Sequence, residues 1–233
     1  MLIHVGQDRT AAVDLKLAIW LSLVAGAVNA ASFRSLGYFS ANMTGNLSSL
    51  SDFLALGQGR LALGFAVLIA GFMLGAFVSG LLIEVGRRMR VRGIYSLSIL
   101  LEGGLLAVLA VLDLAWPGLT GPAALMVGLS FVMGLQNGAS TRISDGRVRT
   151  THVSGIATDI GLGAAQLLAG GAGELRRVLT ARLLLHVSTL AAFFAGGLLG
   201  VWGYGALGAV IYAVIALLLF AIALPGLKRA RAG

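Results

Sequence analysis

Cysteine is absent from this chain, and histidine is scarce. Without cysteine there is no disulfide framework and no thiolate chemistry, so the redox compartment is undetermined. The three histidines are scattered along the sequence, which argues against a transition-metal site. The chain also has no phosphate-binding glycine loop, no metal-protease helix and no nucleophile beside a base. We therefore predict that the protein is not an enzyme and holds no metal or cofactor.

Charged residues are also few, at 11% of the chain, whereas 58% of its 233 residues are hydrophobic. With a mean hydropathy of +0.94, this composition is typical of an integral membrane protein. A membrane-spanning helix needs about 20 apolar residues. Six segments meet this requirement: residues 15–36, 61–85, 94–114, 120–141, 178–201 and 205–225. Residues 202–205 are predicted as the turn between the last two. The predicted fold class is an all-α membrane protein.

Two weaker segments, residues 42–57 and 151–170, decide the topology. If both crossed the membrane, the basic residues 87–92 would lie opposite the basic C-terminal tail, against the positive-inside rule. If both enter and return on the same side, six spans remain and both termini lie in the cytoplasm with the basic loops. We predict this arrangement, with two re-entrant half-helices. It also explains the net charge of +8 without nucleic-acid binding.

An internal repeat accompanies this topology. Residues 26–31 resemble residues 134–139, residues 43–45 resemble 153–155, and residues 71–75 resemble 192–196. Such matches also arise by chance in a chain with 34 glycines. Because the same features recur in the same order, we predict two inverted three-span repeats within one membrane domain. The first covers residues 1–115 and the second residues 116–233.

Polar residues cluster where the two half-helices begin. A helix that begins inside the membrane presents unpaired N–H groups and the positive end of its dipole, which suit an anion or a carboxylate. Thr44 and Thr151 are capping or near-cap residues. The alternative is that these groups only satisfy buried backbone and hold helices together. The candidate substrate-binding residues are Asn29, Asn42, Thr44, Gly45, Asn46, Asn137, Thr151, Ser154 and Gly155.

Ionisable residues inside predicted membrane segments form a second set of candidates. Glu102 and Asp159 are candidates for proton coupling, since carboxylates in a membrane are costly and often functional. Glu102 could instead pair with an arginine of residues 142–149 as a structural tie. Those arginines could attract anions or fix the topology. His186 could bridge helices or relay protons.

The polar strings also carry a family resemblance. Residues 41–46 (Ala-Asn-Met-Thr-Gly-Asn), Asn137 followed by Arg142, and residues 150–155 with Asp159 resemble the YoaK family of bacterial membrane proteins. The sequence departs from the family pattern at Asn29, where members often carry Asp, and at Ser154, where Thr is usual. The resemblance implies a bacterial inner-membrane protein of six or seven spans and implies no substrate.

We predict a transporter or facilitator for a small polar solute, an anion or carboxylate metabolite in preference to a cation. The solute would bind near the middle of the membrane between the two half-helix N-termini. The alternatives are a passive channel and a non-transporting membrane scaffold or accessory subunit. Beyond the solute and the lipid bilayer, the possible partner is a second copy of the chain. Small-residue faces at residues 71–79 and 192–200 permit such a homodimer.

Overall fold

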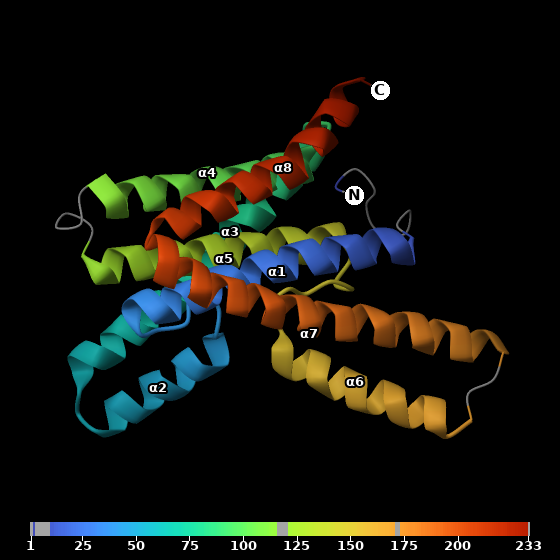
Figure 1. The fold of residues 1–233 in the computed structure, drawn as a ribbon, viewed down its shortest axis with the longest axis horizontal. Coiled ribbons are helices and arrows are strands. Elements are labelled where there is room, and N and C mark those ends of the chain that lie inside the picture. The colour runs from blue at the N-terminus through green and yellow to red at the C-terminus, as the bar shows by residue number, and fades with distance from the viewer. Residues whose placement is uncertain (1, 3–9, 116–120, 171–172, 233) are drawn as a thin grey trace.

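The computed structural model describes residues 2, 10–115, 121–170 and 173–232. Within these residues the chain forms eight α-helices and no strand (Figure 1). The helices are α1 (Ala11–Leu36), α2 (Met43–Ala55), α3 (Gly59–Arg88), α4 (Ile94–Ala115), α5 (Pro122–Ile143), α6 (Val153–Leu168), α7 (Gly173–Leu207) and α8 (Val210–Ala232).

Six of the described helices, α1, α3, α4, α5, α7 and α8, are long and apolar enough to cross a membrane. Each of them covers most of one of the six segments that the sequence predicts, so the predicted class of multi-pass all-α membrane protein is confirmed. The long helices lie along the long axis of the molecule (Figure 1). Both the start of α1 and the end of α8 lie at one end of it. We call this end the terminal end. The predicted connection at residues 116–120 and the first histidine, His4, lie outside the described residues.

The predicted turn at residues 202–205 is wrong, because α7 continues to Leu207 and the turn follows at Gly208. Gly208 has a φ of 57°, which a glycine adopts without strain. Gly203 serves packing instead. A side chain there would collide with Ile211 of α8, so the glycine allows the two helices to approach closely. Glycine and aromatic residues at a helix–helix contact therefore resembled a turn in the sequence.

Glycines also bring the long helices together in two pairs. In the α1–α7 pair, a Cβ atom on Gly26 or Gly196 would collide with a carbonyl oxygen of the other helix. In the α3–α5 pair, the same is true of Gly75 and Gly134. These glycines permit backbone-to-backbone contact, which is a common way to pack helices in membranes. The two pairs form the frame against which the other helices pack.

Large apolar side chains of α1, α4, α5 and α8 fill the core beside these pairs. Leu21, Leu106, Met133 and Tyr212 are among its fully buried members. Close packing of this kind leaves little room for rearrangement.

The short helices α2 and α6, of 13 and 16 residues, have a different arrangement. Both begin near the centre of the molecule, and they run outward toward opposite ends (Figure 1). α2 packs against α3, and α6 packs against α7. Each follows a non-helical stretch, residues 37–42 before α2 and residues 144–152 before α6. This arrangement brings two helix N-termini near each other in the interior.

Candidate functional site

A cavity of about 800 Å³ lies where α2 and α6 begin. Its walls come from the first turns of both helices, from the non-helical stretches before them, and from α1, α3, α5 and α7. We call it the central cavity. Seven of the sequence-predicted binding residues line it: Asn29, Asn42, Thr44, Gly45, Asn137, Thr151 and Ser154.

Asn29 of α1 fixes the stretch that leads into α2. Its Oδ1 accepts a hydrogen bond of 2.9 Å from the backbone N–H of Ala41. One turn further along α1, the Ser32 hydroxyl accepts a bond of 3.2 Å from the N–H of Ser40. All four residues are buried, so these bonds satisfy polar groups that water does not reach. They hold the start of α2 at a set distance from α1.

Asn137 of α5 has the corresponding task before α6. Its Oδ1 accepts bonds from the Thr151 hydroxyl, at 3.0 Å, and the Thr150 hydroxyl, at 3.4 Å. Its Nδ2 donates to the carbonyl of Met133 at 2.8 Å, which orients the amide. Thus each short helix is positioned by an asparagine from the long helix that precedes it.

The first turn of α2 is built for close approach to its backbone. Asn42 is the N-cap residue, and its Oδ1 accepts a bond of 3.2 Å from the N–H of Gly45. A side chain at position 45 would collide with this cap, which explains the glycine. Thr44 lies in the first turn and is exposed toward the cavity. The N-cap of α2 is therefore Asn42, and Thr44 is a near-cap residue.

The first turn of α6 is arranged around His152, which the sequence did not identify as a binding residue. His152 occupies the N-cap position without a side-chain cap bond. Its Nδ1 lies 3.2 Å from Nη1 of Arg149 and accepts a bond from it, since a guanidinium only donates. The imidazole ring lies over the first turn, where a side chain on Gly155 would meet it. Thr151 directly precedes this cap position.

The electrostatics of the central cavity favour an anion. Arg149 is the one arginine, lysine, aspartate or glutamate among the described residues that line it. The first N–H groups of a helix have no intrahelical partner, and the helix dipole adds partial positive charge there. Two such ends border this cavity. The remaining polar lining consists of amide and hydroxyl groups, which can accept or donate, and the imidazole of His152.

Four of the predicted residues lie outside the lining of the central cavity. Asn46 is buried, and its Nδ2 donates to the carbonyl of Phe39 at 3.4 Å. Gly155 and Asp159 line a neighbouring cavity between α6 and α7. Glu102 is fully buried in α4, and neither of its carboxyl oxygens has a hydrogen-bond partner among the described residues. The suggested tie between Glu102 and an arginine of residues 142–149 is therefore not formed.

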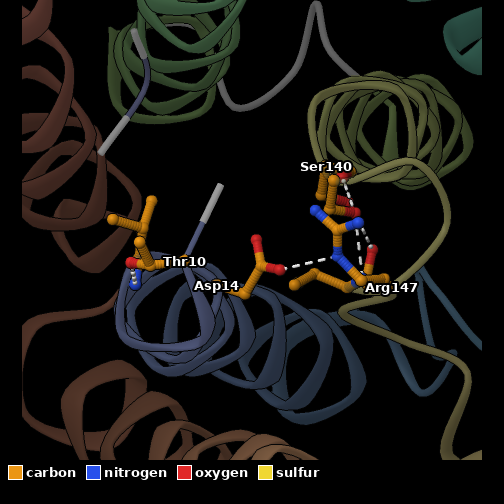
Figure 2. Close-up of polar contacts among 7 residues, drawn as sticks. Thr10, Asp14, Ser140 and Arg147 are labelled. Atoms are coloured by element: carbon orange, nitrogen blue, oxygen red, sulfur yellow. Dashed lines mark hydrogen bonds and ion pairs between the residues drawn. The ribbon is translucent and has the colours of Figure 1, made fainter. Parts of the chain in front are cut away.

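The three arginines of residues 142–149 have separate surroundings. Arg147 forms an ion pair of 2.7 Å with Asp14, near the start of α1 (Figure 2). Arg142 pairs with Glu84 at 3.2 Å near the surface. Arg149 reaches the central cavity. Sequence alone could not separate these cases, because the three residues follow one another closely in a single stretch.

Residues that the sequence reasoning missed include Phe72 of α3 and Phe193 of α7, which line the cavity beside the polar groups. They occupy matching places in the two segments, 71–75 and 192–196, whose similarity the sequence analysis noted. That match was a usable signal. No three His, Cys, Asp or Glu side chains within the described ranges lie close enough together to hold a metal ion.

The fold and the cavity together define a multi-pass helical membrane protein with a polar cavity bordered by two short helices. The chain belongs to the family described as "Protein of unknown function (DUF1275)", whose model matches residues 17–224. The resemblance to the YoaK family is consistent with this membership. No curated protein and no solved structure matches the chain.

Proposed function

We propose that the protein is a transporter or facilitator for a small polar solute, and that the solute is an anion or a carboxylate metabolite. The observation that carries this proposal is the central cavity of about 800 Å³ between the first turns of α2 and α6. A cavity of this size fits the range found for small-molecule sites. About half of the residues that line it carry polar side chains, which are costly inside a membrane.

The chemistry of the lining supports an anion. Helix N-termini bind carboxylate and phosphate groups through free N–H groups and the dipole. Arg149 adds a full positive charge, and Asn137 with Thr151 adds neutral hydrogen-bonding groups. In transporters with broken helices, N-termini at the middle of the membrane bind anionic substrate groups.

The re-entrant topology and the inverted repeat belong to the same proposal. In it, α2 and α6 are half-helices that enter from opposite membrane faces, and residues 1–115 and 116–233 are two inverted repeats. The outward courses of α2 and α6 in Figure 1 support this interpretation. The matched glycine contacts of the α1–α7 and α3–α5 pairs support it too. The proposed location is the bacterial inner membrane, with both termini cytoplasmic.

Proton coupling would require a carboxyl group that can change its protonation state during transport. Asp159 and Glu102 are the proposed candidates. Asp159 lies 3.9 Å from Nε2 of His186, so a proton could pass between them if the two side chains move closer. A dependence of uptake on a proton gradient that disappears in Asp159→Asn or Glu102→Gln would identify the coupling residue. Uptake without any gradient dependence would favour the passive channel.

The test begins with a thermal-shift screen of the purified protein against small carboxylates and inorganic anions. A ligand that binds only the folded state raises the melting temperature. Uptake of the anion identified in the screen is then measured in proteoliposomes. We expect Thr44→Ala, Asn46→Ala, Thr151→Ala and Asp159→Asn to reduce uptake at least tenfold without loss of membrane insertion, through lost contacts or positioning, each of about 1.4 kcal/mol or more.

Thr180→Ala is the matched control for Thr151→Ala. Thr180 is an exposed threonine of α7 whose hydroxyl bonds to the carbonyl of Arg176 within its own helix. Its replacement should leave uptake unchanged. Normal transport by the Thr44 and Thr151 variants would refute the site. A protein that moves none of the anions tested and binds none would favour the scaffold alternative.

A further inference from the structure

A second polar cavity lies beside the central one, between α6 and α7, and has a volume of about 260 Å³. The two cavities share Arg149 and His152 in their walls. A third cavity of about 150 Å³ continues along the same helices and shares Asp159, Arg182 and His186 with the second. These shared residues connect the three cavities in one line. We call the second and third cavities together the α6–α7 groove.

The α6–α7 groove leads from the centre of the molecule to the terminal end. The central cavity borders the start of α6, and α6 runs outward toward that end (Figure 1). The groove follows α6 from Gly155 to Gln166. Its course is therefore set by the direction of α6.

Positive charge predominates in the groove. Arg149 lies at its inner part and Arg182 further out, and neither forms an ion pair with another described residue. Arg147 also lines the groove, but Asp14 neutralises it at 2.7 Å. Asp159 is the one carboxylate in the described lining, and it lies 3.9 Å from the His186 ring. Two uncompensated guanidinium groups would raise the local concentration of anions.

The opposite side of the central cavity, at α2 and α3, has mainly apolar side chains. The Phe65 ring stacks on Phe53, with centroids 5.6 Å apart, and contacts Tyr38 edge-on at 5.3 Å. Phe65, Leu68 and Met126 are buried together there. A cavity of about 460 Å³ lies beside them, and Arg60 is the one charged residue in its described lining. It shares no lining residue with the central cavity, whereas the groove shares Arg149 and His152 with it.

We propose that the α6–α7 groove is an anion-attracting entrance through which carboxylates or inorganic oxyanions reach the central cavity from the terminal end. The inference rests on the proposed function, because it supplies the route to that site. Arg182 captures the anion at the outer part of the groove. Arg149 then receives it where the groove meets the central cavity. The cavity beside Phe65 shares no lining residue with the central cavity, so it does not continue this route to the other end.

The absence of native cysteine allows a direct test with single-cysteine variants. His186→Cys is placed in the groove, where the native side chain is 16% exposed. It is treated with two membrane-impermeant reagents, anionic sulfonatoethyl and cationic trimethylammonioethyl methanethiosulfonate, with both rates normalised to those of 2-mercaptoethanol. Right-side-out and inside-out vesicles present the two ends separately. Cysteine at Arg229, exposed near the end of α8, reports which vesicles present the terminal end.

We expect the cysteine at 186 to react from the terminal end alone, and about tenfold faster with the anionic reagent, as electrostatic focusing of this kind produces. Adding Arg182→Gln should reduce this anion preference several-fold. The matched control is Leu106→Cys, at a fully buried position in the core of α4, which should remain unlabelled from either end. Size-exclusion profiles identify any variant that no longer folds.

Equal labelling of the cysteine at 186 from both ends, or a preference for the cationic reagent, would overturn the inference. So would an anion preference that Arg182→Gln does not change. A protein that transports the screened anion but fails these tests loses the groove as its entrance and keeps the proposed function. A protein that passes them but moves no anion keeps an anion-accessible groove and loses the transport role.

Discussion

Single amide side chains position the two short helices in this molecule. Asn29 accepts the N–H of Ala41, and Asn137 accepts the hydroxyls of Thr150 and Thr151. An asparagine in a membrane helix has a cost, which these bonds offset. The two residues thus connect the frame of long helices to the walls of the central cavity.

This role predicts how position 29 responds to substitution. Asn29→Ala leaves the buried N–H of Ala41 without its acceptor, which should cost about 1–3 kcal/mol of stability. Asn29→Asp retains an acceptor oxygen in the same place, and its melting temperature should stay closer to that of the native protein. Thermal unfolding in detergent measures both. Equal losses would mean that the bond to Ala41 does not hold the stretch before α2.

Glycines of α3 provide a second prediction at this scale. A Cβ on Gly75 would collide with the carbonyl of Phe131, whereas one on Gly80 would meet nothing within 4 Å. Gly75→Ala should destabilise the α3–α5 pair by about 1–3 kcal/mol through overpacking. Gly80→Ala in the same helix should change stability by less than about 1 kcal/mol. Similar melting temperatures for the two variants would contradict the close helix contact.

The sequence predicts which polar residues lie near the site better than it predicts the role of each one. Seven of the nine predicted binding residues line the central cavity, because in the fold each lies close to the start of a short helix. The polar residues that begin these helices stand out in an apolar sequence. Arg149 and His152 were not chosen as binding residues, since an arginine near a membrane segment is usually explained by topology. Only the fold separates Arg149 from Arg147, two residues away.

At the scale of elements, the stretch before α6 depends on an ion pair with α1. The Asp14 side chain is 5% exposed and pairs with Arg147 at 2.7 Å (Figure 2). Breaking a largely buried pair leaves one charge without its partner. This contact therefore fixes residues 144–152 to the start of the chain's first helix.

Asp14→Ala should lower stability by about 1–3 kcal/mol, less than for a fully buried pair because Arg147 is 39% exposed. It should also speed amide hydrogen exchange in residues 144–152. Glu84→Ala is the control, because the Glu84–Arg142 pair is largely exposed and should contribute less than about 1 kcal/mol. If the two variants unfold alike, the Asp14 contact does not anchor the stretch.

The ends of the helices are less clearly encoded in the sequence than the helices themselves. The length of apolar segments is set by the membrane, so the six long helices followed from composition. The end of α7 did not, because Gly203 makes a helix contact and Gly208 makes the turn. A glycine in the sequence does not indicate which of these two tasks it has.

For the whole molecule, the order of helices fixes which loops share a membrane face. In the proposed topology residue 90, between α3 and α4, lies on the cytoplasmic face, and residue 121, before α5, on the other. Arg90→Cys and Gly121→Cys, each as the single cysteine, should therefore react with an impermeant thiol reagent from opposite sides. Labelling from the same side would exclude the six-span arrangement. The central cavity could not be predicted from composition, because it combines residues from both halves of the chain.

The packing of the short helices has a mechanical consequence. α2 buries only Asn46, and α6 only Ile156, whereas the long pairs contact each other through their backbones. Segments with few buried contacts open at lower free energy than the core that supports them. A conformational change that opens the central cavity toward the opposite end would therefore consist of a tilt of α2 and α6. The two pairs of long helices would keep their positions.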